Sequence, residues 1–381
     1  MTISPSQPAS SMSDRASSPK SGPASTIGDD ADFRKAILTM PRWLGVMATL
    51  STAAIVLTLV CLQMGTQYVS LAEVGRIIGR AFGVGETGAN GSSITDTIVL
   101  QLRMPRVLLG FLVGSSLASV GVILQALLRN PLADPYILGV SSGAALGVSL
   151  AVLFGLGGMA WLIPTLPIYG FFGGLLALLV LYRMSATYDR LPVHSVLLAG
   201  VILNAIFSAL IMFITSIMEP NRAFGMMAWL MGSLMATADQ TLLALSIYLA
   251  LCLAWLFKQV NVLNILTLGE EPARSLGVDT ERAKRGILMT AALVTGAVVS
   301  VSGMIGFIGM VVPHAVRLVL GSDHRLLLPA SALVGGMVLM TADTFARSVF
   351  APSELPVGIM TALAGGPFFI YLLVWRKDRL A

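Results

Sequence analysis

Few side chains in this sequence could carry acid–base chemistry. Asp343 is the carboxylate that we place well inside an apolar run, and Arg347 follows at the spacing that puts both side chains on one face of a helix. A paired charge costs far less in an apolar medium than a lone one, so a structural ion pair is sufficient to explain Asp343. The pattern argues against proteolysis by paired aspartates and against a proton relay through carboxylates.

Nucleotide and metal chemistry are not indicated either. None of the five lysines follows a glycine, so the chain lacks a Walker-type phosphate loop and cannot hydrolyse ATP by that route. His194, His314 and His324 have neither HExxH nor paired ligand spacing. Cys61 and Cys252 lie inside apolar runs, where small buried side chains are the usual interpretation. We predict that the chain is not an enzyme, needs no cofactor and holds no metal ion.

Two arginines, Arg103 and Arg106, stand at the start of an apolar run long enough to cross a bilayer. A polar hinge bracketed by prolines, 130–135, ends this run, and a second apolar run with glycine at every fourth position follows. Glycines at such spacing lie on one face of a helix and let the backbones of two helices touch. The alternative is that this face is exposed to lipid. We predict packing contacts for five glycines: Gly110, Gly114, Gly139, Gly143 and Gly147.

The composition places the chain among membrane proteins. Hydrophobic residues make up 56% and charged residues 11% of the sequence, and the mean hydropathy is +0.84. Soluble domains usually have about 25% charged residues. The net charge of +5 does not indicate nucleic-acid binding, because the basic residues lie at the ends of apolar runs rather than on one soluble face.

Ten apolar runs predict an all-α polytopic membrane protein with about ten transmembrane helices. The runs are roughly 43–64, 104–128, 136–156, 160–182, 193–217, 240–257, 286–304, 306–320, 326–349 and 357–375. An even number of spans puts both termini on one side, and the excess of Lys and Arg in alternate connections makes that side cytoplasmic. Six arginines fall on the outer side against this rule: Arg76, Arg80, Arg103, Arg106, Arg222 and Arg347.

The sequence predicts two regions, a disordered cytoplasmic tail over residues 1–40 and a transmembrane domain over residues 41–381. Residues 1–30 are rich in Ser and Pro and cannot bury enough apolar surface to fold. They contain no apolar stretch of the kind that signal peptides have.

Two segments between apolar runs predict short helices. On the outer side, Ser70 and Glu73 form a capping box for a helix that stops at Gly83. On the inner side, 261–285 is the longest polar interruption after the tail, and it holds a helix stop at Gly277. We expect two short helices on the cytoplasmic face there.

Five motifs follow one another in order. They are LRMPRVLLGFLVGSSLA (102–118), QALLRNPLADPYILGVSSGAALG (125–147), LTLGEEPARSLGV (266–278), GMIGFIGMVVPHAVRLVLGSDHRLLLP (303–329) and ELPVGIMTALAGGPFFIYLL (354–373). With them, residues 43–376 resemble the FecCD/BtuC-type permeases of type II ABC importers, which carry iron–siderophore complexes, haem and vitamin B12 across bacterial inner membranes. The resemblance implies ten helices per subunit and a homodimer with a central translocation path.

The resemblance also implies roles for the outer arginines. In such permeases outward arginines receive acidic side chains of a periplasmic binding protein, and the rigid fork of arginine suits carboxylates. The matching residues are Arg103, Arg106 and Arg347. Contact with lipid headgroups is the alternative for the first two.

Two further sites follow from the resemblance on the inner side. The segment that docks on the ATPase subunit matches eight residues: Leu268, Gly269, Glu270, Glu271, Ala273, Arg274, Leu276 and Gly277. The cytoplasmic gate matches Asn130 and Leu132. Val193 and His194 fall at the positions of its second half, where the family has small hydroxyl residues. We therefore leave the assignment of Val193 and His194 to the gate undecided.

We therefore expect the membrane subunit of a binding-protein-dependent ABC importer in the bacterial inner membrane, moving a ferric siderophore or haem. A vitamin B12 permease is the nearest alternative. An ion-coupled secondary transporter would need inward carboxylates, and a membrane enzyme would need clustered catalytic groups. Expected partners are a second copy of the chain, a pair of ABC ATPase subunits, a periplasmic substrate-binding protein and membrane lipid, without nucleic acid.

Overall fold

The computed structural model describes residues 38–65, 67–81, 94–160, 163–185, 192–234, 239–349, 351 and 353–375. The chain divides into two units, Met1–Leu38 and Thr39–Ala381, and every element below belongs to the second. Most of the predicted tail and the helix stop at Gly83 lie outside the described residues.

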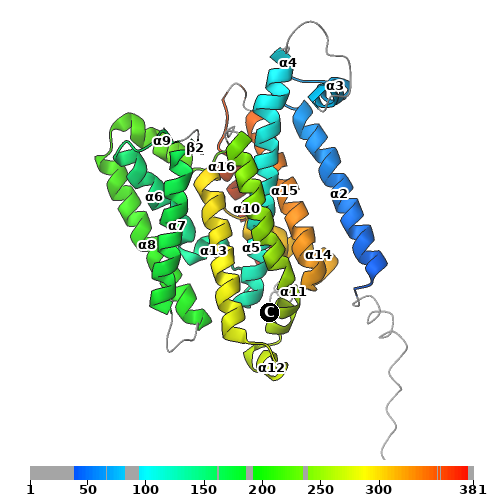
Figure 1. The fold of residues 1–381 in the computed structure, drawn as a ribbon, viewed down its shortest axis with the longest axis vertical. Coiled ribbons are helices and arrows are strands. Elements are labelled where there is room, and N and C mark those ends of the chain that lie inside the picture. Colours follow the sequence, from blue (N-terminus) through cyan, green and yellow to red (C-terminus); the bar gives the residue numbers. More distant parts are fainter. Residues whose placement is uncertain are drawn as a thin grey trace, which may run out of the picture. The chain divides into compact units, whose positions relative to one another are not determined.

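The described chain is built from helices, which confirms the all-α class (Figure 1). The helices are α2 (Met40–Gln63), α3 (Leu71–Ala81), α4 (Ile94–Thr97), η1 (Ile98–Arg103), α5 (Met104–Leu127), η2 (Pro135–Leu138), α6 (Val140–Leu153), α7 (Thr165–Ser185), α8 (Val193–Ile217), α9 (Pro220–Leu230), α10 (Asp239–Lys258), α11 (Val260–Leu266), α12 (Glu270–Ser275), α13 (Thr280–Ser302), α14 (Ile308–Leu320), α15 (His324–Ser348) and α16 (Val357–Trp375). Two short strands, β1 (Met159–Ala160) and β2 (Ile163–Pro164), pair antiparallel before α7, so the run predicted from residue 160 becomes helical at Thr165.

Seven helices of the described chain are long and apolar enough to cross a membrane. They are α2, the continuous stretch Ile94–Leu127, α7, α8, α10, α13 and α15. Three shorter apolar helices, α6, α14 and Val357–Tyr371 of α16, coincide with the remaining predicted runs. Each of the ten runs thus contains one of these helices, while the number of spans stays a prediction because α6 and α14 are short for a crossing.

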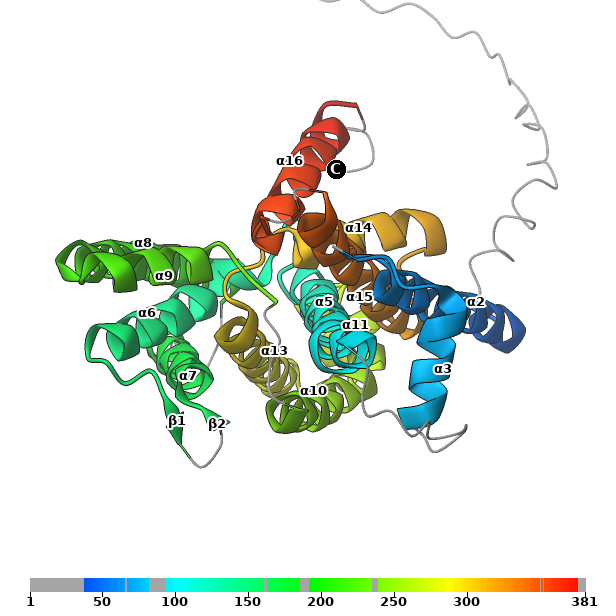
Figure 2. The same ribbon diagram turned by 90° about the horizontal axis from the view of Figure 1, so that it is seen from above.

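Helix α5 lies at the centre of the bundle. In Figure 2 it is surrounded by α10, α13, α14 and α15, while α6, α7 and α8 form a group on the far side of α13. The most apolar part of the α5 span is 83% buried, compared with 11% for α2, which packs mainly on α15. An apolar helix that is buried all round belongs to the core, and one that is exposed all round needs lipid or a partner.

Small residues let the central helices approach backbone to backbone. A side chain at Gly114 of α5 would collide with the backbone of Gly335 on α15, and one at Gly143 of α6 would collide with Ala177 on α7. Gly147 meets the backbone of Tyr169 on α7 in the same way. Such contacts are the usual means of helix association in membranes, where apolar side chains gain little by leaving lipid.

Two of the predicted packing glycines have a different environment. Gly110 sits more loosely, since an added Cβ would lie 3.3 Å from the Met340 Cα atom on α15. Gly139 lies before α6 rather than inside it, with φ +75° at the junction between η2 and α6. Only glycine adopts this left-handed conformation without cost, so Gly139 serves the turn as well as a contact with Leu203.

The short helix α3 begins where the capping signal places it. The Glu73 backbone N–H donates to the Ser70 hydroxyl over 3.3 Å, which satisfies one free donor of the first turn. Its apolar side chains Val74 and Ile77 are buried beside the end of α2, so α3 is fixed to the bundle.

Replacing Gly143 by Ala should destabilise the bundle. The new methyl group would overlap the Ala177 Cβ atom, and overpacking of this kind costs about 1–3 kcal/mol. The measurement is thermal unfolding of the purified protein in detergent. Gly75→Ala on α3 is the matched control, because a Cβ there meets no atom within 4 Å, and it should leave stability unchanged or slightly raised. Equal stability of the two variants would show that the α6–α7 contact is not tight.

Candidate functional site

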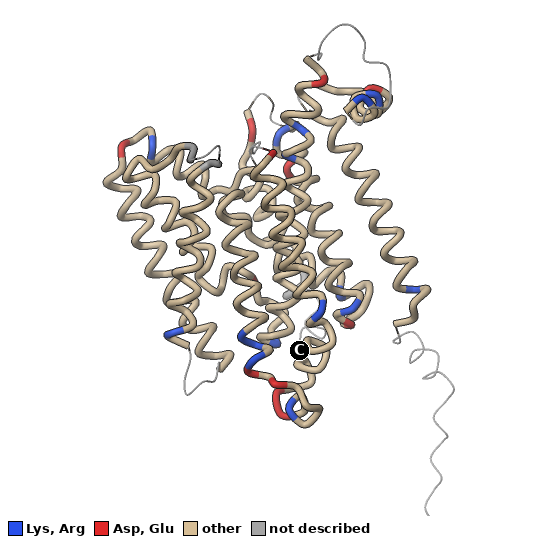
Figure 3. The backbone as a smooth tube through the Cα atoms, in the orientation of Figure 1, with Lys and Arg blue, Asp and Glu red and all other residues tan. Residues whose placement is uncertain are grey.

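Charged residues collect at the two ends of the helices (Figure 3). We call these the α12 end, which includes α11 and α12, and the α3 end, which includes α3 and the start of α5. The separation follows from the cost of placing charges among apolar side chains. The sequence-predicted coupling and gate residues lie at the α12 end, and the predicted docking arginines lie at the α3 end.

At the α12 end, the predicted coupling segment folds as the two short helices α11 and α12. Gly269 precedes α12 with φ +127°, and Gly277 follows it with φ +83°, so both turns require a residue without a side chain. Asp279 then caps α13, because its carboxylate accepts a hydrogen bond from the Arg282 backbone N–H over 3.0 Å.

A cluster of four charges fixes α12 to α13. The Lys284 ammonium nitrogen lies 3.1 Å from a Glu270 carboxylate oxygen and 2.7 Å from one of Glu281. Arg274 completes the cluster at 3.4 Å from Glu281 and 3.7 Å from Glu270. Because Lys284 is buried, it depends on these partners, and the cluster holds α12 in one orientation.

A second anchor, which the sequence did not reveal, joins α11 to the start of α15. The Asn264 side-chain amide donates to Asp323 over 3.0 Å, and its oxygen accepts from the His324 backbone N–H over 3.0 Å. Asp323 also pairs with Arg325, and hydrogen bonds from Arg325 and Asn264 outweigh partial burial and lower the pKa of Asp323 to about 2. The coupling segment is therefore attached to both α13 and α15.

The apolar residues of the segment divide into two groups. Leu263 and Leu266 of α11 are buried in the core of the chain, so they do not form part of an exposed docking face. Leu268 and Leu276, on either side of α12, are 67% and 64% exposed. These two leucines are the large apolar side chains of the segment that remain available to a partner, and Glu271 and Arg274 are exposed beside them.

The hinge between α5 and η2 is held by its own polar side chains. The Asn130 side chain accepts from the Leu132 backbone N–H over 2.9 Å, and Asp134 accepts from the Tyr136 N–H over 2.8 Å. The half-buried position of Asp134 removes its carboxylate from water and raises its pKa to about 6, although the bond from Tyr136 opposes this. The predicted gate loop is therefore an ordered turn.

Arg129 gives this hinge an unusual backbone. It adopts φ +46° at the position after the end of α5, where glycine is usual. The flanking bonds are those of a Schellman motif: Asn130 N–H donates to the Gln125 carbonyl and Arg129 N–H to the Ala126 carbonyl, over 3.2 and 3.3 Å. A left-handed residue with a side chain costs about 1–2 kcal/mol, and such outliers gather at functional sites.

A cleft of about 570 Å³ brings the gate and coupling residues together. Its lining is Leu128, Arg129, Pro192, Val193, His194, Glu270, Glu271, Arg274, Glu281 and Lys284. The predicted gate residues Val193 and His194 thus face the charged cluster, whereas Asn130 and Leu132 lie next to the cleft in the same hinge. The gate residues and the coupling residues lie on different segments of the sequence, and the folded chain brings them to the same cleft.

At the α3 end, two of the predicted docking arginines cap helix α2. The Arg103 guanidinium donates to the carbonyls of Leu62 and Gln63 over 2.9 and 3.1 Å, and also to the carbonyl of Gln67. Arg347 donates to the carbonyl of Cys61 over 3.0 Å. The last carbonyls of a helix have no partner within the helix and favour positive charge, so both arginines stabilise the end of α2.

Arg106, the third of these arginines, binds two carboxylates. Its guanidinium holds Asp343 through bonds of 2.9, 3.0 and 3.2 Å and Glu354 through one of 2.8 Å. Arg347 lies 3.9 Å from Asp343, so Arg106 and not Arg347 is the main partner of Asp343. The expected ion pair within α15 is therefore present, but the tighter, two-pronged bond to Asp343 comes from α5.

Comparison with known proteins shows to which family this chain belongs. The chain matches the FecCD transport family over residues 53–375. This protein belongs to the FecCD transport family. It is 44% identical over 287 residues to the hemin transport system permease protein HmuU of Yersinia pestis, covering 74% of this chain and 84% of that one.

A second relative and a solved structure are also described as transport proteins. It is 42% identical over 303 residues to the cobalamin import system permease protein BtuC of Halobacterium salinarum, covering 78% and 77% of the two chains. A solved structure described as an inward-facing metal-chelate type ABC transporter superimposes with a TM-score of 0.74 and 28% identity over 87% of this chain and 99% of the other. The chain is therefore a permease subunit in an inner membrane rather than an enzyme.

Among the described residues, no group of three or more His, Cys, Asp or Glu side chains lies close enough together to hold a metal ion. The α12 end offers leucines and a charged cleft, and the α3 end offers a carboxylate–arginine cluster whose outermost member, Glu354, is 56% exposed on its side chain.

Asp343→Asn should destabilise this permease much more than Glu354→Gln. The Asp343 side chain is 2% exposed, and removing one partner of a buried ion pair costs about 3–5 kcal/mol. Glu354 forms the exposed half of the cluster, where a pair contributes about 0–1 kcal/mol. Thermal unfolding of both variants in the same detergent measures the difference. Equal losses would contradict the assignment of Asp343 as the central carboxylate.

The stability of this permease should fall as pH rises from 4 to 7, in part through Asp134. A carboxyl group whose pKa is about 6 when folded and about 3.9 when unfolded binds its proton more tightly in the folded state. Its stabilising effect is complete below the unfolded pKa and is lost as pH rises through the folded pKa. Asp134→Asn keeps the acceptor for Tyr136 and removes the titration, so its unfolding temperature should vary less over this range. Parallel pH profiles of parent and variant would disprove the effect.

Proposed function

We propose that this chain is the permease subunit of a binding-protein-dependent ABC importer that moves a ferric siderophore or haem. The hemin permease relative and the metal-chelate transporter support an iron-containing cargo. Vitamin B12 is the second candidate, since a cobalamin permease is 42% identical. The observation that carries the proposal is the cleft, which joins the α5–η2 hinge to an exposed segment suited to an ATPase.

We place the α12 end and both termini in the cytoplasm. Most lysines and arginines lie in the connections at that end, as the positive-inside rule requires. The arginines at the α3 end oppose the rule, and their intramolecular partners supply the reason: Arg103 and Arg347 bind carbonyls and Arg106 binds carboxylates. They are structural charges and do not act as topological signals.

The homodimer partner would cover the apolar faces of α8 and α16. These faces carry large exposed side chains: Leu198, Val201, Ile206, Met212, Phe213 and Ile217 on α8, and Leu363, Ile370, Tyr371 and Val374 on α16. Figure 2 shows both helices at the outside of the bundle, and η2, which follows the hinge, contacts α8. A translocation path between two copies would therefore run beside the gate loop.

Coupling would proceed from α12 to the hinge. A partner bound to Leu268 and Leu276 moves α12, and the charged cluster transmits that movement to α13. The Arg129 guanidinium lies close to the turn at Gly269, 3.9 Å from the position of an added Cβ, so the end of α5 also follows α12. Each ATPase cycle would in this way act on the gate without any catalytic group in the permease.

The docking of a binding protein would use Arg106 and the surface around Glu354. An acidic side chain of the partner could replace Glu354 on Arg106, because the Glu354 side chain is 56% exposed. Arg103 and Arg347 would need to leave the α2 carbonyls before binding another protein. Charge reversal at Arg103 would place a carboxylate against those carbonyls and unfold the end of α2, and a change at Arg106 would leave buried Asp343 without its main partner, so docking is better tested at Glu354.

The experiment is a double substitution, Leu268→Asp and Leu276→Asp, in the permease co-purified with its candidate ATPase. Both side chains are exposed, so the bundle should stay folded while the ATPase binds at least tenfold more weakly, as expected for removing two apolar anchors worth about 1 kcal/mol or more each. Uptake of ferric siderophore, haem and vitamin B12 into proteoliposomes is measured together with ATP turnover.

The matched control is Leu71→Asp, an exposed leucine on α3 at the opposite end. It should leave ATPase binding at the parent level, whatever its effect on uptake. Uptake that continues in the double variant with no ATPase bound would overturn the proposal in favour of a secondary transporter.

A further inference from the structure

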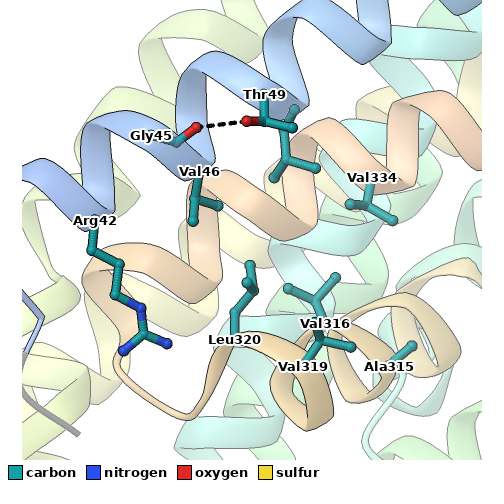
Figure 4. A pocket seen from close by; sticks show the side chains of 10 residues that line it. Arg42, Gly45, Val46, Thr49, Ala315, Val316, Val319, Leu320 and Val334 are labelled. Carbon is teal, nitrogen blue, oxygen red and sulfur yellow. Dashed lines mark hydrogen bonds between the residues drawn. The ribbon is translucent and has the colours of Figure 1, made fainter. Parts of the chain in front are cut away.

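A groove of about 620 Å³ lies between the first half of α2 and helices α14 and α15 (Figure 4). Gly45, Val46 and Thr49 form its α2 wall, and Val316, Val319 and Leu320 form the wall opposite. The groove exists because α2 packs on α15 and leaves α14 partly uncovered. It belongs to neither the cleft nor the arginine cluster.

The groove is apolar because its polar atoms are satisfied internally. The Thr49 hydroxyl donates to the Gly45 carbonyl over 2.9 Å, so the side chain turns its methyl group outward. At Gly45 itself an added Cβ atom would meet no atom within 4 Å, so the groove is open at this position. Its volume lies within the range of ligand pockets, and Arg42 is the charged residue among those that line it.

One charge stands at the α12 end of the groove. Arg42 lines the groove there, and Figure 4 shows its guanidinium turned toward the connection between α14 and α15. Next to it, the Trp43 indole N–H donates to the Arg325 carbonyl over 3.1 Å and ties α2 to the start of α15. An apolar channel with a cation and an anchored indole at one end has the pattern of a membrane–water boundary.

We propose that this groove binds an anionic phospholipid of the cytoplasmic leaflet, with one acyl chain along the groove and the phosphate at Arg42. The assignment of leaflet rests on the orientation proposed above. Charge complementarity supports the choice, because the cytoplasmic leaflet contains anionic lipids that attract basic side chains near the surface. The bound chain would fill the space between α2 and α14 and hold α2, the most exposed span, against the bundle.

The headgroup rather than the chain decides which lipid binds. An acyl chain leaving the bilayer for this groove gains little, because lipid is already apolar. A phosphate at Arg42 gains a charge-assisted contact that a zwitterionic lipid offsets with its own cation. The proposal is therefore a preference for anionic over zwitterionic lipids with the same chains.

The test is native mass spectrometry of the purified chain after delipidation and addition of phosphatidylglycerol or phosphatidylcholine with identical chains. The parent should retain phosphatidylglycerol about fivefold more strongly, the factor expected for one basic residue near the surface. Arg42→Gln should reduce this preference to about one. Gly45→Leu fills the groove at this open position and should reduce retention of both lipids.

Arg76→Gln is the matched control, since Arg76 is an exposed arginine on α3, at the other end of the bundle, and it should behave as the parent. Inorganic phosphate at the same concentration should not compete, because it cannot occupy the groove. Equal retention of the two lipids by the parent, or an unchanged preference in Arg42→Gln, would overturn the proposal. Lipid retention is measured without transport, so a failure of uptake alone would affect only the proposed function.

Discussion

The structure depends on one constraint: a polar group surrounded by apolar side chains must find its partner within the chain. The end of α2 shows how this is met, since three successive carbonyls, from Cys61 to Gln63, receive hydrogen bonds from Arg347 and Arg103. These two arginines belong to different helices, so the cap also fixes the order in which α2, α5 and α15 pack. Charges at the edge of this bundle are thus part of its framework.

Local rules predicted what depends on local sequence. The apolar runs 43–64 and 193–217 match α2 and α8 closely, because run length follows membrane thickness, and Gly277 correctly marked the end of α12. Partners distant in sequence were not predictable. Asp343 was matched to Arg347 four residues away, whereas its main partner, Arg106, is 237 residues away. Likewise, no pattern separated buried Leu263 from exposed Leu268, since that difference depends on α13 and α15.

The candidate site illustrates the same division. The coupling and gate residues were placed on separate segments by resemblance, and their roles stay predictions. Folding adds the cleft they share, and it adds Lys284, Glu281 and Asn264, which attach the coupling segment to α13 and α15. Lys284 lies near the start of α13, and its burial was not predictable, because a lysine is almost never buried unless it is paired and its partners are known only from the fold.

The glycine contacts of α5 restrict which parts of the permease can move separately. Where Gly114 meets Gly335, and where Gly121 meets the backbone of Gly309 on α14, no side chains lie between the helices that could change rotamer and absorb a shift. Sliding one helix along another would require the backbones to separate first. Helices α5, α14 and α15 therefore form a stiff spine, and an alternating-access cycle would concentrate its bending at the ends of that spine, beginning with the turn at Arg129.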